Sequence, residues 1–166
     1  MAKSKGKALE QRVKDECLNL VVTKVPEDVR YIAGRVVRKK TKFDFCVAVD
    51  SIAAFFDCKE VLSKDEFYIK SYVLDEKKLH QWVAIKDAYV NHCIAGYLIH
   101  FKSHSKISWV NAQVIDTCIR EGVKSVNPDT VGVVSQPDDA QINLRKLLYN
   151  DRHRIINRLN ELRRGF

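Results

Sequence analysis

The sequence predicts an α/β protein in which helices cover a mixed β-sheet. Two apolar, β-prone runs, residues 43–49 and 52–56, are separated by the turn-like pair Asp50-Ser51, which is typical of a hairpin. A helical pattern begins near residue 75, and two further β-prone runs follow it. A helix that crosses between strands of one sheet favours a parallel pairing, so we expect the sheet to be mixed.

The segment before the hairpin predicts one helix and one strand. Residues 6–20 are expected to be helical because their apolar residues recur at helical spacing. These residues are Leu9, Val13, Cys17 and Leu20. Residues 23–34 contain a proline and a glycine and predict a loop. Residues 35–38 predict a strand that leads into the hairpin, so three strands are expected to run together there.

After the hairpin, Asp75 is a candidate N-cap for a helix. Its expected buried stripe consists of Leu79, Trp82, Ile85 and Tyr89. Residues 94–101 and 107–111 predict two strands joined by a polar turn. A short helix over residues 114–119 should end at Gly122.

The C-terminal part predicts irregular structure followed by helices. Residues 123–138 contain two prolines and a glycine and are expected to be irregular. From about residue 138, leucines and isoleucines recur at helical spacing up to Leu162, which predicts one or two amphipathic helices. Their apolar stripe suits core packing, a dimer seam or a clamp on a DNA backbone, and core packing is the simplest of these.

Length and composition indicate an ordinary globular protein. The chain has 166 residues, of which 46% are hydrophobic and 30% charged, which suits a single domain with its own core. No apolar run approaches the ~20 residues that a membrane helix needs, and the basic N-terminus lacks the apolar segment of a signal peptide. We therefore expect a soluble, cytoplasmic protein. Its five scattered cysteines show no metal-site spacing and predict reduced thiols.

The net charge of +8 is concentrated in clusters, which favours a polyanionic partner such as a nucleic acid. The cluster before the hairpin contains Arg35, Arg38, Lys39, Lys40 and Lys42. The N-terminal cluster includes Lys5 and Lys7. We interpret these residues as candidates for DNA binding. A solvated basic surface is the simpler alternative for any one cluster.

Two carboxylates of the hairpin are the candidate metal ligands. If the turn is centred on residues 50 and 51, Asp44 lies opposite Asp57, with Cβ atoms roughly 4.5–5.5 Å apart. Like charges so placed repel each other, and a divalent cation between them would turn this repulsion into binding energy. Alternatively, Asp44 marks the exposed face of an edge strand, and Asp57 pairs with Lys59 or Lys42.

This arrangement suits phosphodiester hydrolysis, which requires charge stabilisation at the phosphate and an activated water. The backbone carbonyl of Cys58 is a further candidate ligand. Lys59 shares a face with Asp57, where it would contact the phosphate or orient the water. Glu10, from the first helix, would support these ligands or bind a second ion.

Glu10, Asp44 and the tripeptide Asp57-Cys-Lys59 together resemble the PD-(D/E)XK nuclease pattern. More narrowly, the chain is similar to Holliday-junction resolvases of the archaeal, phage and RecU type over about residues 5–112. In the RecU group a His-Gln pair opens the helix after the tripeptide, and this chain has His80-Gln81 in that place. Phe43 stands where the family has a proline.

The resemblance implies a restriction-endonuclease-like fold, with a mixed β-sheet flanked by helices. It implies one nuclease domain over residues 1–166, with a core of about 5–122 and a basic helical extension of about 138–166. It implies Mg²⁺, or Mn²⁺ as a substitute, at Asp44 and Asp57, with catalytic Lys59 supported by Glu10 and Gln81.

The implied partners are a four-way junction of double-stranded DNA and a second copy of the chain, in the cytoplasm of a prokaryotic or phage-infected cell. A two-fold dimer suits paired nicks in a two-fold substrate. Two alternatives stay open. One is a restriction- or repair-type endonuclease selective for sequence or structure, and the other is a non-catalytic DNA-binding protein with a decayed site.

Overall fold

The computed structural model describes residues 7–17, 20–25, 28–32, 35–39, 42–62 and 66–164. Within these ranges, the side chains of residues 28–32, 35–39, 162 and 163 are not described. No helix in these ranges has the length and apolar character needed to cross a lipid bilayer.

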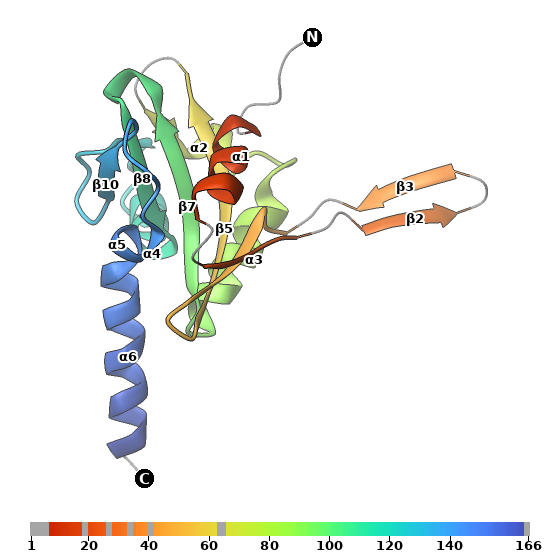
Figure 1. Ribbon diagram of the computed structural model, residues 1–166. Helices are drawn as coiled ribbons and strands as arrows, with labels where there is room; N and C mark the ends of the chain where they lie inside the picture. Colours follow the sequence, from red (N-terminus) through yellow and green to blue (C-terminus); the bar gives the residue numbers. More distant parts are fainter. Residues whose placement is uncertain are drawn as a thin grey trace.

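A six-stranded mixed sheet forms the centre of the molecule (Figure 1). In spatial order its strands are β1 (Val21–Lys24), β4 (Phe45–Val49), β5 (Ile52–Val61), β7 (Ile94–Phe101), β8 (Lys106–Asn111) and β10 (Val134–Pro137). Strands β5 and β7 are parallel, and every other neighbouring pair in this sheet is antiparallel. The predicted α/β class with a mixed sheet is therefore confirmed, and the parallel pair is the one that the crossover helix joins.

Helices pack on both faces of this sheet. The α1 face carries α1 (Lys7–Glu16), α5 (Leu144–Leu147) and α6 (Tyr149–Arg164). The α3 face carries α2 (Ile69–Tyr72), α3 (Leu79–Val90) and α4 (Ala112–Arg120). Each face has its own apolar core cluster, and alternate residues of β5 contribute to the two. Phe56 and Cys58 are buried on the α1 face, whereas Val61 is buried on the α3 face.

The β4–β5 hairpin has the register that the sequence predicts. Phe45 pairs with Phe56, and Val49 with Ile52, so the turn consists of Asp50 and Ser51. Both turn residues have positive φ, 47° and 67°. Positive φ at both central positions is the signature of a type I′ turn, whose twist matches that of the strands it joins. Aspartate tolerates this region better than most residues, so Asp-Ser serves in place of the commoner Asn-Gly.

The prediction for the segment before the hairpin was wrong in part. Residues 23–34, expected to be a loop, contain the end of β1 and all of β2 (Asp28–Ile32). The strand predicted at residue 35 exists as β3 (Arg35–Lys39), but it pairs with β2 and does not join the hairpin in the main sheet. The proline and the glycine flank short β-prone runs and do not interrupt them. In Figure 1 this two-stranded ribbon projects from the body of the molecule.

The helix predicted from Asp75 begins later, at Leu79. Asp75 instead closes a turn before it, where its Oδ1 accepts a hydrogen bond from the backbone N–H of Lys77 at 3.0 Å. Trp82 and Ile85 are buried as predicted, but Leu79 is 42% exposed. The helix therefore turns a narrower apolar stripe toward the sheet than the sequence suggests.

One helix boundary and two short strands also differ from the sequence-based prediction. The first helix ends at Glu16, four residues short of the predicted end. Within the segment expected to be irregular, β9 (Ser125–Val126) pairs with β6 (Phe67–Tyr68), and β10 joins the main sheet. Short strands of this kind are set by the partner they pair with, which local sequence patterns do not reveal.

The C-terminal segment is part of the core and not an appendage. Leu144, Leu147, Leu148 and Ile155 are buried in the α1-face cluster. Asp151, on the first turn of α6, accepts a hydrogen bond from the Trp109 indole N–H at 2.6 Å and so ties the helix to β8. The far half of α6 extends beyond the sheet, where Leu159 is 44% exposed (Figure 1). Core packing, the simplest of the three interpretations, is confirmed for the first half of this helix.

Candidate active site

The candidate site forms at the open end of the β4–β5 hairpin, just before β4 begins, where β5 stays paired with β7 but has no β4 partner. Asp57 and Lys59 point to the α3 face, as their spacing predicts, and the Lys59 ammonium contacts Oδ2 of Asp57. The Asp57 side chain is only 1% exposed, and that of Lys59 is 15% exposed. A buried carboxylate with one cationic partner makes a strong local field, because little water is present to screen it.

Helix α3, which packs on the same face of the sheet, adds Gln81 to the contact between Asp57 and Lys59. Gln81 donates a hydrogen bond from Nε2 to Oδ1 of Asp57 at 3.2 Å and accepts one from the Lys59 ammonium at 3.4 Å. The three side chains therefore form a closed ring of contacts. The structure thus brings Gln81, which the resemblance alone implied, to both residues of the tripeptide that carry charge.

Asp44 lies just beyond the last residue pair of the hairpin. Its backbone N–H donates to the Phe56 carbonyl at 3.1 Å, and its Oδ2 accepts from the Cys58 N–H at 2.8 Å. Burial raises the pKa of Asp44 to about 8, and the hydrogen bond and negative charge of Asp57 also raise it. At neutral pH Asp44 therefore retains its proton, which avoids repulsion between the two closely placed carboxyl groups.

The backbone of Cys58 adds a carbonyl oxygen on the same side as Asp44. In a strand, the N–H and C=O of one residue point to the same neighbour, and those of the next residue point to the opposite one. The Cys58 N–H points to the Asp44 side, so its C=O does too, beyond the end of β4. The Cys58 thiol lies on the α1 face and is buried, and burial raises its pKa well above the usual value. It is a neutral core side chain.

Glu10, on α1, lies next to the edge strand β1 and away from the carboxylate pair. Its Oε2 forms an ion pair with the ammonium of Lys24, at the end of β1, at 2.6 Å. Its charge is one cause of the raised pKa of Cys58, after burial and the charges of Asp44 and Asp57. Within the described part of the chain, no contact joins Glu10 to either aspartate. Glu10 therefore affects the Cys58 thiol electrostatically and, in the described residues, pairs with Lys24 and not with the carboxylate pair.

The donor set fits Mg²⁺ or Mn²⁺ better than zinc. No group of three or more His, Cys, Asp or Glu side chains is placed to hold a metal among the residues described. Two carboxylates and one backbone carbonyl are all oxygen donors, and Mg²⁺ binds through one or two carboxylates while it keeps several waters. The raised pKa of Asp44 means that a cation bound there would replace a proton.

The sequence did not single out Tyr97, which lies next to the site. It pairs with Asp57 in the parallel β5–β7 register and is 1% exposed. Its hydroxyl is buried without a hydrogen-bond partner among the described residues. Burial and the negative charge of Asp57 raise its pKa. A phenol in the middle of an otherwise apolar strand was the available signal, but only the register places it beside Asp57.

Apolar rings enclose the carboxylate pair on the hairpin side. The Phe43 and Phe55 rings pack with centroids 5.0 Å apart, and both are half-buried. Phe43 directly precedes Asp44, and Phe55 lies two residues before Asp57 and therefore on the same face. Phe43 thus helps to exclude water and strengthens the electrostatic interactions of the two acids.

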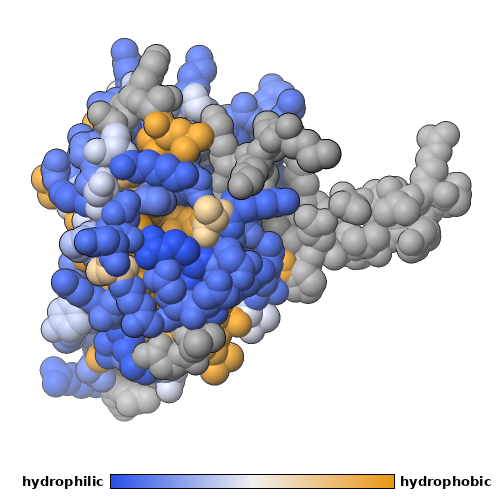
Figure 2. Space-filling view, turned by 45° about the horizontal axis from the view of Figure 1, so that its top comes forward, coloured by the Kyte–Doolittle hydropathy of each residue, from blue (hydrophilic) through white to orange (hydrophobic). Residues whose placement is uncertain are grey.

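The candidate DNA-binding residues are described only in part. Lys7 and Lys42 are exposed, and Lys42 lies two residues before Asp44. Arg35, Arg38 and Lys39 belong to β3, whose backbone is described but whose side chains are not. Lys5 and Lys40 lie outside the described residues. Figure 2 shows that hydrophilic residues dominate the described surface on the side that it presents.

No protein-family model matches the chain, and no curated protein sequence matches it significantly. Its function is therefore inferred from the arrangement of Asp44, Asp57, Lys59 and Gln81.

Proposed function

We propose that this protein is a metal-dependent endonuclease that resolves four-way DNA junctions by paired, symmetric nicks. The observation that carries the proposal is the convergence of Asp44, Asp57 and Lys59 at the open end of the β4–β5 hairpin. A half-buried acid with a raised pKa beside a buried one, with an ammonium group in contact, forms the kind of site that divalent cations occupy in phosphodiester hydrolysis.

Each residue has a distinct role in this proposal. Asp44, Asp57 and the Cys58 carbonyl hold Mg²⁺ or Mn²⁺, which supplies charge neutralisation at the scissile phosphate and an acidic water. Lys59 moves from Asp57 to a phosphate oxygen, where it stabilises developing charge and orients the attacking water. Gln81 keeps the side chains of Asp57 and Lys59 in place. Glu10 modulates the site electrostatically.

The proposed substrate is branched DNA, and the proposed assembly is a homodimer. Contacts to phosphates read the shape of the junction and carry little sequence information, which suits the basic clusters around Lys42 and Lys7. Symmetric nicking needs two sites related by a two-fold axis, so one active site per chain requires two chains.

One observation favours a second candidate, a DNA-binding protein without catalysis. Both carboxylate oxygens of Asp57 already have protein partners, Gln81 on one and Lys59 on the other. If those contacts persist when a divalent ion is offered, the ion has no place to bind and only the basic surface remains functional.

A cleavage assay distinguishes these candidates. A labelled four-way junction and a linear duplex of matched sequence are incubated with the protein and Mg²⁺ or Mn²⁺. We expect symmetric nicks in the junction only. Asp57→Asn and Lys59→Ala should slow cleavage by at least about a hundredfold and leave junction binding intact. Asp116→Asn is the matched control, because its ion pair with Lys86 lies on the exposed surface.

The remaining outcomes point to the alternatives. Cutting of the linear duplex at a fixed sequence would favour an endonuclease of the restriction or repair type. Binding of the junction without cleavage under either metal would favour the non-catalytic protein. A monomer by sedimentation in the presence of the junction would contradict the paired-nick mechanism.

A further inference from the structure

A cavity lies on the α1 face, across the sheet from the carboxylate pair. It has a volume of about 770 Å³ and is formed by the end of α1, the start of β10, the segment before α5, and α5–α6. We call it the α5–α6 cavity. Its lining residues Cys17, Ile142 and Leu144 belong to the α1-face core, whereas Gln81 contacts Asp57 from α3. The two sites therefore cannot hold the same phosphate.

The lining of the cavity is apolar at its floor and polar at its rim. Leu20, Val134, Ile142 and Leu144 supply apolar surface. Asn150 and Tyr149, at the start of α6, stand at the rim with the exposed cations of α5. A cavity of this size, with an apolar wall and a few convergent polar groups, suits a small organic ligand.

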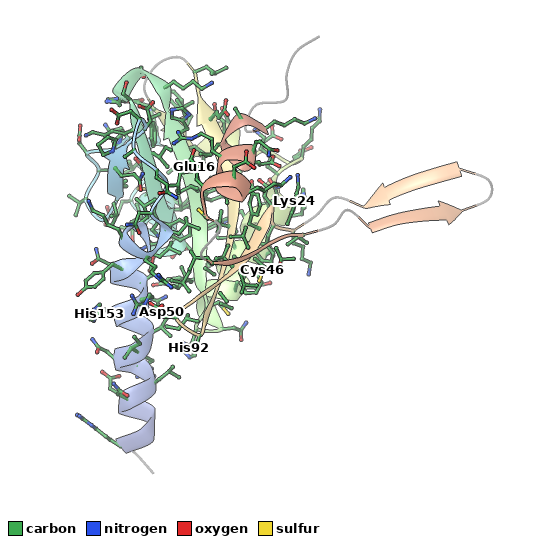
Figure 3. The ribbon with its side chains drawn as sticks, viewed as in Figure 1. Glu16, Lys24, Cys46, Asp50, His92 and His153 are labelled. Atoms are coloured by element: carbon green, nitrogen blue, oxygen red, sulfur yellow. The ribbon has the colours of Figure 1, made fainter. Side chains whose placement is uncertain are left out.

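The charge of the cavity is strongly positive. Arg145, Lys146 and Arg152 all line it. Among the described residues, the acid paired with these cations is Asp50, at the β4–β5 turn. Its carboxylate lies 3.4 Å from Nε of Arg145 and 3.0 Å from Nη2 of Arg152. Figure 3 shows Asp50, at the turn of the hairpin, beside α6, which carries His153. One carboxylate against three cations leaves an excess of positive charge.

Arg152 lines this cavity and also carries a buried donor without a partner among the described residues. Its Nε is buried and has no hydrogen-bond partner among the described residues, although Nη2 contacts Asp50. A buried donor without a partner is costly, and most such groups in native proteins are satisfied. A guanidinium group that is already held on one side presents its remaining N–H groups as a fork that matches phosphate oxygens.

We propose that the α5–α6 cavity binds a nucleotide. Its phosphate is held by Arg145, Lys146 and Arg152, and its sugar and base lie against the apolar floor. Inorganic phosphate satisfies the cations but leaves that floor uncovered. The nucleotide is either free or the end of a nucleic-acid strand, since both present the same phosphate, sugar and base. The proposal does not depend on nuclease activity.

Calorimetric titration without divalent metal tests the proposal on the full chain. The probes are deoxyadenosine 5′-monophosphate, inorganic phosphate and a 5′-phosphorylated pentanucleotide of thymidine. We expect the mononucleotide to bind more tightly than inorganic phosphate. Lys146→Gln and Arg145→Gln should each weaken nucleotide binding about tenfold, because each removes one charged hydrogen bond. Arg158→Gln is the control, since Arg158 is exposed and pairs with Glu161 outside this cavity.

The probes distinguish a free nucleotide from a strand end, and one variant separates this site from the nuclease site. Tighter binding of the pentanucleotide identifies a strand end as the ligand, and equal binding identifies a free nucleotide. Asp57→Asn must bind nucleotide as the wild type does, so this site is tested independently of the nuclease site. The proposal is overturned if neither nucleotide probe binds at millimolar concentration, if phosphate binds as tightly as they do, or if Lys146→Gln and Arg145→Gln bind unchanged.

Discussion

The two ends of the β4–β5 hairpin carry acids in opposite electrostatic situations. At the open end, the half-buried Asp44 lies beside the buried Asp57, which the Lys59 ammonium contacts. At the turn, Asp50 is 38% exposed and lies between two arginines. At the open end, two carboxyl groups face one ammonium group, and Asp44 retains a proton. At the turn, one carboxylate faces two arginines, and the Nε of Arg152 has no hydrogen-bond partner among the described residues.

This difference shows how one hairpin can support two kinds of binding. Burial makes the open end sensitive to charge, because the low local dielectric penalises any unpaired carboxylate. Solvent at the turn weakens each ion pair, so Asp50 holds its arginines without fully neutralising them. These opposite situations are the basis for proposing a cation at the open end and an anion in the cavity beside the turn.

The largest effect is expected from removing the cation at the open end. Lys59→Ala leaves the carboxylate of Asp57 buried without its ammonium partner, and breaking a buried pair typically costs about 3 kcal/mol in the free energy of unfolding. Mg²⁺ should restore part of this loss. Urea unfolding with and without Mg²⁺ measures both effects.

Lys86→Ala is the matched control for that experiment. The ion pair of Lys86 with Asp116 has a lysine that is 50% exposed, and such pairs contribute below about 1 kcal/mol. Equal losses for the two variants would show that the open end of the hairpin is no more sensitive to charge than the surface.

The next effect is a dependence of stability on pH. The pKa of Asp44 is about 8 in the folded chain and near its ordinary 3.8 in the unfolded chain, so the folded state binds the extra proton between these values. The contribution of Asp44 to stability is then complete below about pH 4 and falls as pH rises toward 8, with a loss of about 1 kcal/mol between pH 6 and 7.

Urea unfolding at several pH values tests this dependence, and Asp44→Asn should remove it. Because a metal ion must displace the same proton, Mg²⁺ binding should release about one proton at pH 6.5. Calorimetry in two buffers with different ionisation enthalpies measures that release. Proton-independent Mg²⁺ binding would place the ion away from Asp44.

A smaller effect is expected at the turn. Asp50→Asn removes the acid that pairs with Arg145 and Arg152, and loss of these partly exposed ion pairs should cost at most about 1 kcal/mol of unfolding free energy. The same change should tighten deoxyadenosine 5′-monophosphate binding in the α5–α6 cavity several-fold, which titration measures. Weaker nucleotide binding in a fully folded variant would mean that Asp50 positions the arginines and does not compete with the ligand.

The smallest effect concerns Tyr97. Its hydroxyl is buried without a partner in the described part of the chain, so Tyr97→Phe should raise the free energy of unfolding by about 0.5 kcal/mol. Urea unfolding of the metal-free protein is the measurement. A loss above 1 kcal/mol would show that the hydroxyl makes a hydrogen bond, with a bound water as its partner.

The sequence by itself determined the local geometry of the hairpin. The turn at Asp50 and Ser51, the opposition of Asp44 and Asp57, and the shared face of Asp57 and Lys59 all follow from the two-residue period of a strand. Apart from two helix boundaries and the exposure of Leu79, the wrong predictions concern pairing partners: β3 pairs with β2, and β1 and β10 join the main sheet. Their residues are compatible with several neighbours, and local patterns do not choose among them.

Only the tertiary structure decided what reaches each end of the hairpin from elsewhere in the chain. The packing of α3 on the sheet brings Gln81 to Lys59, and the parallel register brings Tyr97 beside Asp57. The docking of α5 and α6 carries Arg152 to Asp50, far away in the sequence. These contacts depend on how two separate apolar cores fill the two faces of one sheet. Packing is a collective property of many side chains, so no local spacing in the sequence encodes it.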